Sequence, residues 1–204
     1  TLEPGTVIPP GDSLFLTPNA IAFRQRTVSP SGGEQNYAQG NYSGNLSNFG
    51  ESITLSNDDG VLIDSETYLG TPTDNQLNLV VSEIMYDPIN PDAEYLEFTN
   101  ISTTLTLDLT GVVFTDGFEF QFPNGYMLGP GQQTLVVLNQ TVFESVHGAG
   151  HPIAGQFTSG RLSNGGEKLK IDDADGSTIR EFTYDNNLPW PTPPAGENFS
   201  LVLI

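Results

Sequence analysis

The close spacing of glycine and proline is the feature that most restricts how this 204-residue chain can fold. Its 22 glycines and 15 prolines interrupt nearly every window of about ten residues, so no stretch keeps the apolar period of an amphipathic helix. Between the interruptions lie short runs of β-branched or aromatic residues, which are typical of strands. These runs are 13–16, 52–55, 79–86, 94–98, 134–138 and 168–171. Their spacing predicts an all-β sandwich.

The run 168–171 also predicts its own orientation. Lys168 and Lys170 alternate with Leu169 and Ile171, and successive side chains of a strand point to opposite faces. We therefore expect the two lysines in solvent and Leu169 and Ile171 in the core. Helical turns are expected only at 20–23 and 141–145, because each of these follows an asparagine that can cap a helix.

The charge of the chain argues against two classes of partner. Six basic residues stand against 25 acidic ones, giving a net charge of −19. Binding to nucleic acid or to anionic membrane surfaces depends on Lys and Arg, so neither is an expected partner. No apolar run approaches the roughly 20 residues that span a bilayer, so membrane insertion is not expected either. The absence of cysteine removes disulfides and thiolate metal sites.

An internal repeat organises the sequence. A shift of 120 residues places several landmarks on identical residues: Gly5 on Gly125, Pro10-Gly11 on Pro130-Gly131, Asn19 on Asn139 and Phe23 on Phe143. A shift of 116 residues places a longer set on identical residues: Gly44, Leu46-Ser47-Asn48, Gly50-Glu51, Asp59-Gly60, Ile63 and Thr67-Tyr68 on Gly160, Leu162-Ser163-Asn164, Gly166-Glu167, Asp175-Gly176, Ile179 and Thr183-Tyr184. Because order and spacing both agree, we expect two tandem copies of one unit.

The two copies are unequal. Residues 1–70 match only 121–186, so the first copy has no counterpart of the strands between Leu77 and Phe120, or of the final run 199–204. A sandwich that lacks strands exposes unpaired backbone groups and apolar faces, which proteins otherwise pair or cover. We therefore expect a partner to complete the first copy.

Three aromatic residues of the first copy are the candidates for the face that meets this partner: Tyr42, Phe49 and Tyr68. The polar segment 71–77 is interpreted as a linker between the copies. The expected organisation is thus a partial unit over 1–70, a linker over 71–77 and a complete unit over 78–204.

Residues 78–204 resemble the lamin tail domain as it occurs in bacterial secreted proteins. The opening strand 79–88, the second strand 94–100 and the short motif Leu107-Asp108-Leu109-Thr110-Gly111 follow the order of that family. Later landmarks are 160–167, Pro189-Trp190-Pro191 and the closing motif 196–201. The first copy carries only the later landmarks and resembles the back half of a second domain.

The resemblance implies an immunoglobulin-like β-sandwich without catalytic activity. It also implies an accessory role in an extracellular or cell-surface protein, which we expect to be bacterial. A likeness of fold does not by itself fix a ligand.

The sequence offers little for catalysis. His147 and His151 are the only histidines, and two glycines and a proline in their loop break the helix that would aim both rings at one metal. No Gly-x-Ser-x-Gly elbow is present. We therefore expect the chain not to be an enzyme, although an activity through the two histidines is a third hypothesis.

Calcium is the one cofactor candidate, because oxygen-rich loops with closely spaced carboxylates suit a hard cation. One loop supplies Asp87, Asp92 and Glu94, and a second supplies Asp173 and Asp175. The alternative at each loop is an acidic turn solvated by water.

These observations lead to two hypotheses about function. The first is a non-catalytic extracellular structural or adhesion module that assembles with protein partners by strand completion. The partner would be a second copy, giving a homo-oligomer or filament, or another domain of the parent protein. The second is an accessory domain of a larger secreted hydrolase or nuclease, which binds calcium through the acidic loops or carbohydrate through Trp190.

Overall fold

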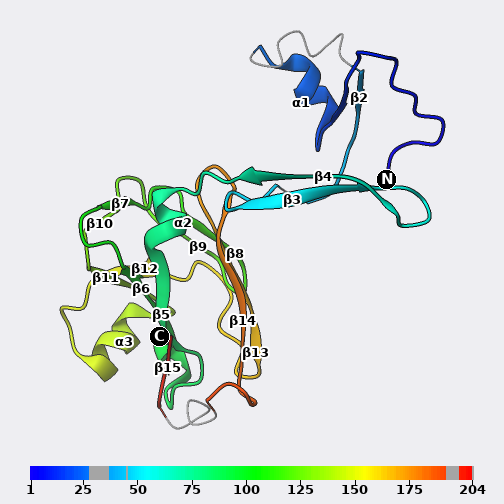
Figure 1. Cartoon of the computed structure of the whole chain (residues 1–204). Coiled ribbons are helices and arrows are strands. Elements are labelled where there is room, and N and C mark those ends of the chain that lie inside the picture. Colours follow the sequence, from blue (N-terminus) through cyan, green and yellow to red (C-terminus); the bar gives the residue numbers. More distant parts are fainter. Residues whose placement is uncertain (28–36, 45, 192–197, 204) are drawn as a thin grey trace. The chain divides into compact units, whose positions relative to one another are not determined.

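The computed structural model describes residues 1–27, 37–44, 46–191 and 198–203. The chain divides into two compact units, residues 1–70 and 71–204. Strands with few helices build both of them, which confirms the predicted β class (Figure 1). Gly196 and Glu197 of the predicted closing motif lie outside the described residues.

Two main sheets form the second unit. A five-stranded sheet has the order β12-β11-β6-β5-β15, formed by Ile153–Gln156, Gln133–Val137, Tyr95–Asn100, Leu79–Met85 and Leu201–Val202. A four-stranded sheet has the order β14-β13-β8-β9, formed by Thr178–Asp185, Gly166–Asp172, Val113–Asp116 and Phe120–Gln121. A small antiparallel pair joins β7, Leu107–Asp108, to β10, Met127–Leu128. Neighbouring strands are antiparallel except β11 and β12, which run parallel.

The hydrophobic core of the second unit lies between the two main sheets. The Phe98 ring of β6 meets the Phe114 ring of β8 with 5.6 Å between centroids, and the Tyr86 and Tyr184 rings lie 5.2 Å apart. Leu169 and Ile171 of β13 are buried in this core while the neighbouring lysines are not, which confirms the predicted alternation. The observed strand therefore has the orientation that its pattern indicated.

A helix covers the other face of the five-stranded sheet. Helix α3, Gln140–His147, begins after Asn139, whose side-chain oxygen accepts a hydrogen bond from the amide of Val142 at 3.2 Å. Its Phe143 is buried in a second cluster with Met85, Tyr95, Leu135 and Val137. This helix is longer than the turn predicted at 141–145 and takes in His147.

The segment 71–77 is not a linker, and this prediction is wrong. It enters helix α2, Asp74–Asn78, in which Thr73 and Gln76 form a reciprocal capping box. Asn75 and Gln76 are buried, and the Gln76 amide donates to the carbonyl of Thr178 at 2.8 Å. Polar residues are used here because they satisfy hydrogen-bonding groups of distant strands.

Two separate strand pairs and one helix are found in the described residues of the first unit. Strand β1, Leu14–Leu16, runs parallel to β2, Tyr37–Gln39. Helix α1, Ala20–Gln25, follows the capping residue Asn19, near the turn predicted at 20–23. Strands β3, Gly50–Ser56, and β4, Leu62–Leu69, form an antiparallel hairpin.

The hairpin β3–β4 has the same register as β13–β14. Gly50 pairs with Leu69 as Gly166 pairs with Asp185, and both hairpins show an irregularity just before their last pair. Gly50 and Gly166 both adopt a positive φ, of 82° and 95°. A Cβ on either would lie within 2.6 Å of a tyrosine carbonyl, so only glycine fits both corners.

Candidate functional site

The hairpin β3–β4 exposes the side chains that its counterpart buries. Ile53 is 50% exposed, Leu55 46% and Ile63 62%, whereas the residues 116 positions later, Leu169, Ile171 and Ile179, are 0%, 1% and 2% exposed. Each pair occupies the same place in the same hairpin register. The difference therefore arises from what covers the hairpin and not from the hairpin itself.

The same polar network holds the base of both hairpins. The Tyr68 hydroxyl donates to the Ser47 carbonyl at 2.9 Å and contacts the Glu51 carboxylate at 3.0 Å. The Tyr184 hydroxyl makes the two equivalent contacts, to Ser163 and Glu167, at the same distances.

Glu51 and Glu167 also accept hydrogen bonds from the backbone amides of Ser47 and Ser163. Burial is the main factor that raises the pKa of Tyr184, and the Glu167 carboxylate adds to it. The first unit thus keeps the local geometry of a hairpin that is built to be covered.

In the second unit the facing five-stranded sheet covers this face of the hairpin, and the free edge is occupied by strand β8. It pairs with the outer edge of β13, placing Phe114 opposite Ile171 and Asp116 opposite Lys170. In the first unit, among the residues that the structure describes, β3 pairs only with β4. Its outer edge therefore presents unpaired backbone groups beside an exposed apolar face.

The three aromatic residues predicted for the completion face are only part of this surface. Tyr42 and Phe49 are exposed, as expected for such a face, but Tyr68 is half-buried and its hydroxyl is used within the unit.

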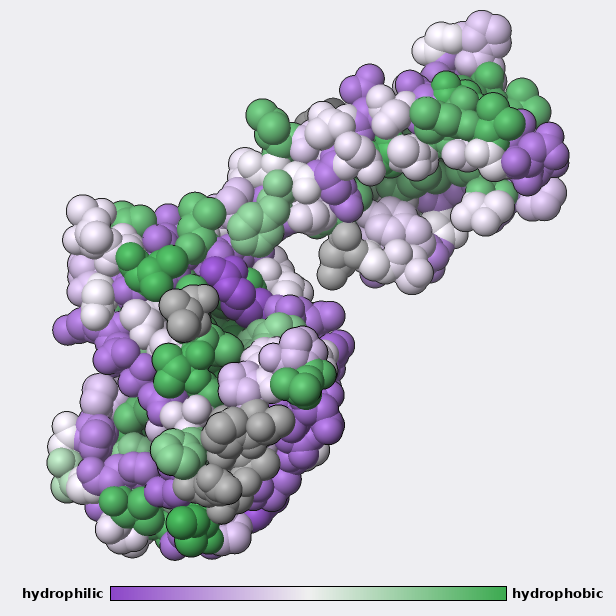
Figure 2. Space-filling view, turned by 60° about the horizontal axis from the view of Figure 1, so that its bottom comes forward, coloured by the Kyte–Doolittle hydropathy of each residue, from purple (hydrophilic) through white to green (hydrophobic). Residues whose placement is uncertain are grey.

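The main apolar surface consists of residues that the prediction did not include. We call it the open face, and it comprises Ile53, Leu55 and Ile63, the exposed counterparts of the core residues Leu169, Ile171 and Ile179. The alternation in Ser52-Ile53-Thr54-Leu55, set against Lys168-Leu169-Lys170-Ile171, was the signal for it. Figure 2 shows hydrophobic residues gathered at the surface of the first unit.

The acidic loop near β6 does not gather its carboxylates around a cation. Asp92 pairs with Arg161 at 3.1 Å, and Asp87 accepts a hydrogen bond from the Asn164 amide. Glu94 follows the short 3₁₀ helix Pro91–Ala93 and is almost fully buried. Its carboxylate accepts a hydrogen bond from the amide of Leu162 at 2.8 Å, and burial raises its pKa to about 7.

The second acidic loop also uses its carboxylates internally. Asp173 accepts hydrogen bonds from the Thr73 hydroxyl at 2.9 Å and from the Asn75 amide at 3.2 Å. Asp175 accepts one from the amide of Ser177, and hydrogen bonding to Ser177 lowers its pKa. Across the described ranges, no three His, Cys, Asp or Glu side chains come together to hold a metal. The five predicted calcium ligands therefore do not converge.

The two histidines pack against an aromatic residue. The Phe143 ring lies 4.7 Å from His147 and 5.4 Å from His151. A His151 ring nitrogen lies 3.1 Å from the His147 carbonyl, and burial lowers the pKa of His147. These contacts explain the histidines as part of the packing around α3.

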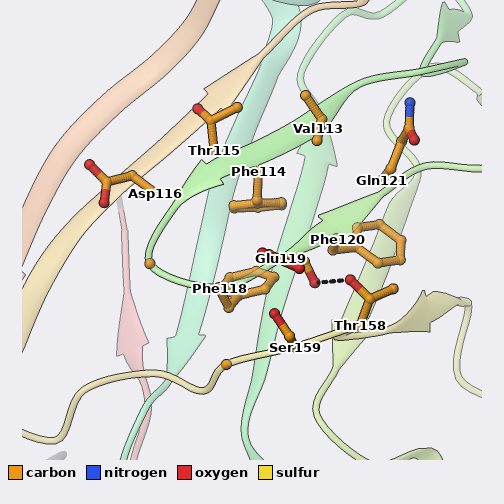
Figure 3. A pocket seen from close by; sticks show the side chains of 12 residues that line it. Val113, Phe114, Thr115, Asp116, Phe118, Glu119, Phe120, Gln121, Thr158 and Ser159 are labelled. Atoms are coloured by element: carbon orange, nitrogen blue, oxygen red, sulfur yellow. Dashed lines mark hydrogen bonds between the residues drawn. The ribbon is translucent and has the colours of Figure 1, made fainter.

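A pocket lies beside the β8–β9 hairpin and is lined mainly by aromatic and small polar residues (Figure 3). Phe114, Phe118 and Phe120 point their rings toward its interior, and the Thr158 hydroxyl donates to the Glu119 carbonyl at 2.9 Å. Of its two carboxylates, Asp116 is paired with Lys168 at 3.0 Å. The twelve lining residues include no histidine, lysine or arginine.

Fold and site together define an immunoglobulin-like β module with one covered and one open hairpin. The model of the Lamin Tail Domain family matches residues 72–186, which is more than half of the chain. The chain therefore belongs to the lamin tail domain family. A search of curated proteins gave no match. Within the described residues, no helix is both long and apolar enough to cross a membrane.

Proposed function

We propose that this chain is an extracellular structural or adhesion module that assembles with protein partners by strand completion. One strand of the partner would pair with the outer edge of β3, and further strands would pack over the open face. Main-chain hydrogen bonds would supply affinity, and alternate side chains would supply specificity.

The observation that carries the proposal is the contrast between equivalent residues of the two hairpins. Ile53 and Leu55 are half-exposed on the same scaffold that buries Leu169 and Ile171. Two-stranded hairpins are marginal in water without a packed face. The first unit should therefore be more stable when a partner covers the open face.

The second copy and the location also belong to the proposal. The shared register, the shared tyrosine network and the two capped helices support a first unit that is the back half of a lamin tail domain. The extracellular, bacterial setting is supported by the resemblance of residues 78–204 to lamin tail domains of bacterial secreted proteins.

Light scattering across a dilution series tests the proposal on the intact chain. Without its partner, the open face should drive reversible association at high concentration, and the double variant Ile53→Asp/Leu55→Asp should abolish it. The matched control is Ile89→Asp/Ile101→Asp, which changes two exposed isoleucines of the second unit and should leave association unchanged. Association that is equal in all three chains, or absent from all three, would contradict the proposal.

The accessory-domain alternative has less support. Its calcium ligands are engaged with Arg161, Asn164, Thr73 and backbone amides, and Trp190 packs against the core as a partly buried residue. Calorimetric titration of the intact chain with calcium and with a glycan panel would revive this alternative if it released heat of binding.

A further inference from the structure

We propose that the open face is the acceptor site for the front half of a lamin tail domain carried outside residues 1–204. This occupant corresponds to β5–β9 of the second unit. The proposal rests on the proposed function and adds the kind of partner that completes the first unit.

The acceptor geometry supports this kind of occupant. In the second unit β8 pairs with β13 through Phe114 opposite Ile171, and the Phe114 ring stacks on Phe118 at 4.3 Å. Leu55 is the counterpart of Ile171 in a hairpin of identical register. A strand that carries an aromatic residue opposite Leu55 would therefore extend the hairpin as β8 extends β13. The equivalents of β5 and β6 would cover the open face, as their residues Ile84, Leu96 and Phe98 pack in the core with Leu169 and Ile171.

The number of front halves in the chain argues against exchange between copies. The described residues hold one front half, β5–β9, and two acceptor hairpins. A second copy could pair its β8 with β3 only by uncovering its own β13. Exchange among copies therefore leaves the number of open faces unchanged and gives no drive toward closed oligomers.

The polar face of β3 defines the charge of the occupant. Ser52 and Thr54 stand where β13 has Lys168 and Lys170, and Lys168 pairs with Asp116 of β8 at 3.0 Å. A carboxylate at the Asp116 position would find no lysine on β3. We infer that the occupant carries a neutral side chain there, which also distinguishes it from the front half of a second copy.

A second difference lies at the end of the hairpin. Arg180 donates to the carbonyl of Gln76 in α2 at 2.7 Å, whereas its counterpart in the first unit is Asp64. A carboxylate cannot donate to that carbonyl. This hydrogen bond to α2 is therefore absent from the completed first unit.

An extended chain tests the proposal with the whole protein retained. It carries a second copy of residues 79–120 directly before Thr1, because the repeat of 120 residues makes Thr1 the counterpart of Gln121. Either front half can then pair with either acceptor, and every arrangement completes both units. Hydrogen exchange over residues 50–69 is compared in the extended and intact chains.

The extended chain should slow exchange in this hairpin by about a hundredfold or more and remove the concentration-dependent association. Exchange as fast as in the intact chain would overturn the proposal. So would a discrete dimer of the intact chain whose hairpin is as protected as β13–β14, because the occupant would then be a second copy. That second result would leave the proposed function standing.

Two variants of the extension make the test specific. Phe114→Asp, made only in the added segment, should abolish the protection of β3–β4. The original front half is unchanged, so continued protection of β13–β14 shows that the rest of the chain still folds. Asp116→Ser in the added segment should protect the hairpin more than the unchanged extension does. Weaker protection by Asp116→Ser would contradict the charge assigned to the occupant.

Discussion

Alanine substitutions at Leu169 and Ile53 should differ sharply in cost, although the two residues occupy equivalent positions. Leu169 is fully buried beside Ile171, so Leu169→Ala removes core contacts and leaves a cavity. Such a change costs about 2–5 kcal/mol. Ile53 is half-exposed, so Ile53→Ala should cost roughly 0.5 kcal/mol or less, as for a surface substitution.

Trp190 provides the assay for the second unit, because it is the single tryptophan and packs against the core of that unit. With a urea dependence of about 2 kcal/mol/M, Leu169→Ala should lower the urea midpoint of Trp190 fluorescence by roughly 1–2.5 M. Ile53→Ala should leave that midpoint unchanged and alter exchange in β3–β4 by about threefold at most. A loss of protection in β3–β4 as large as that in β13–β14 would refute the claim that the open face is uncovered.

Three further substitutions test the second unit. Glu94 has a pKa raised to about 7, so its contribution to the unfolding free energy should be fully present below about pH 4.5 and fall by up to about 3 kcal/mol as the pH rises to 7. Urea unfolding of Glu94→Gln should show a flatter pH profile, whereas the exposed control Glu119→Gln should keep the slope. Gly166→Ala forces a Cβ to 2.5 Å from the Tyr184 carbonyl at a positive φ, and should lower the thermal midpoint more than Gly125→Ala, where the Cβ meets nothing. Tyr184→Phe leaves the Glu167 and Ser163 contacts of a buried side chain unmade and should cost about 1–3 kcal/mol by urea unfolding, against less than about 1 kcal/mol for Tyr68→Phe at the more exposed position.

The longer strands were predictable because their side chains alternate over several residues. The run 168–171 gave both the strand and its buried face, since Leu169 and Ile171 alternate with lysines. Strands of two residues, such as β7 and β9, are too short to show a period. Their pairing depends on residues far along the chain.

Helix α2 was missed for a different reason. Its polar residues look like a linker, because local composition does not show that Asn75 and Gln76 reach Asp173 and Thr178 about 100 residues away. The partners of the acidic loops are also distant in the sequence. Only the fold shows that Arg161 and the Leu162 amide occupy the carboxylates of Asp92 and Glu94.

The open face was half-predicted. The missing strands indicated that the first unit is incomplete, but the residues chosen were aromatic ones, because large side chains dominate apolar surfaces. The alignment with residues 168–171 pointed instead to Ile53 and Leu55, which the structure exposes.

Hydrogen exchange over residues 50–69, compared with residues 166–185 in the same dilute intact chain, tests most directly whether the first unit is open. The two segments share one register and one tyrosine network, so each serves as the control for the other. We predict that β3–β4 exchanges at least about a hundredfold faster than β13–β14. Equal protection of the two hairpins in the dilute monomer would mean that the open face is already covered, and would contradict strand completion by a partner.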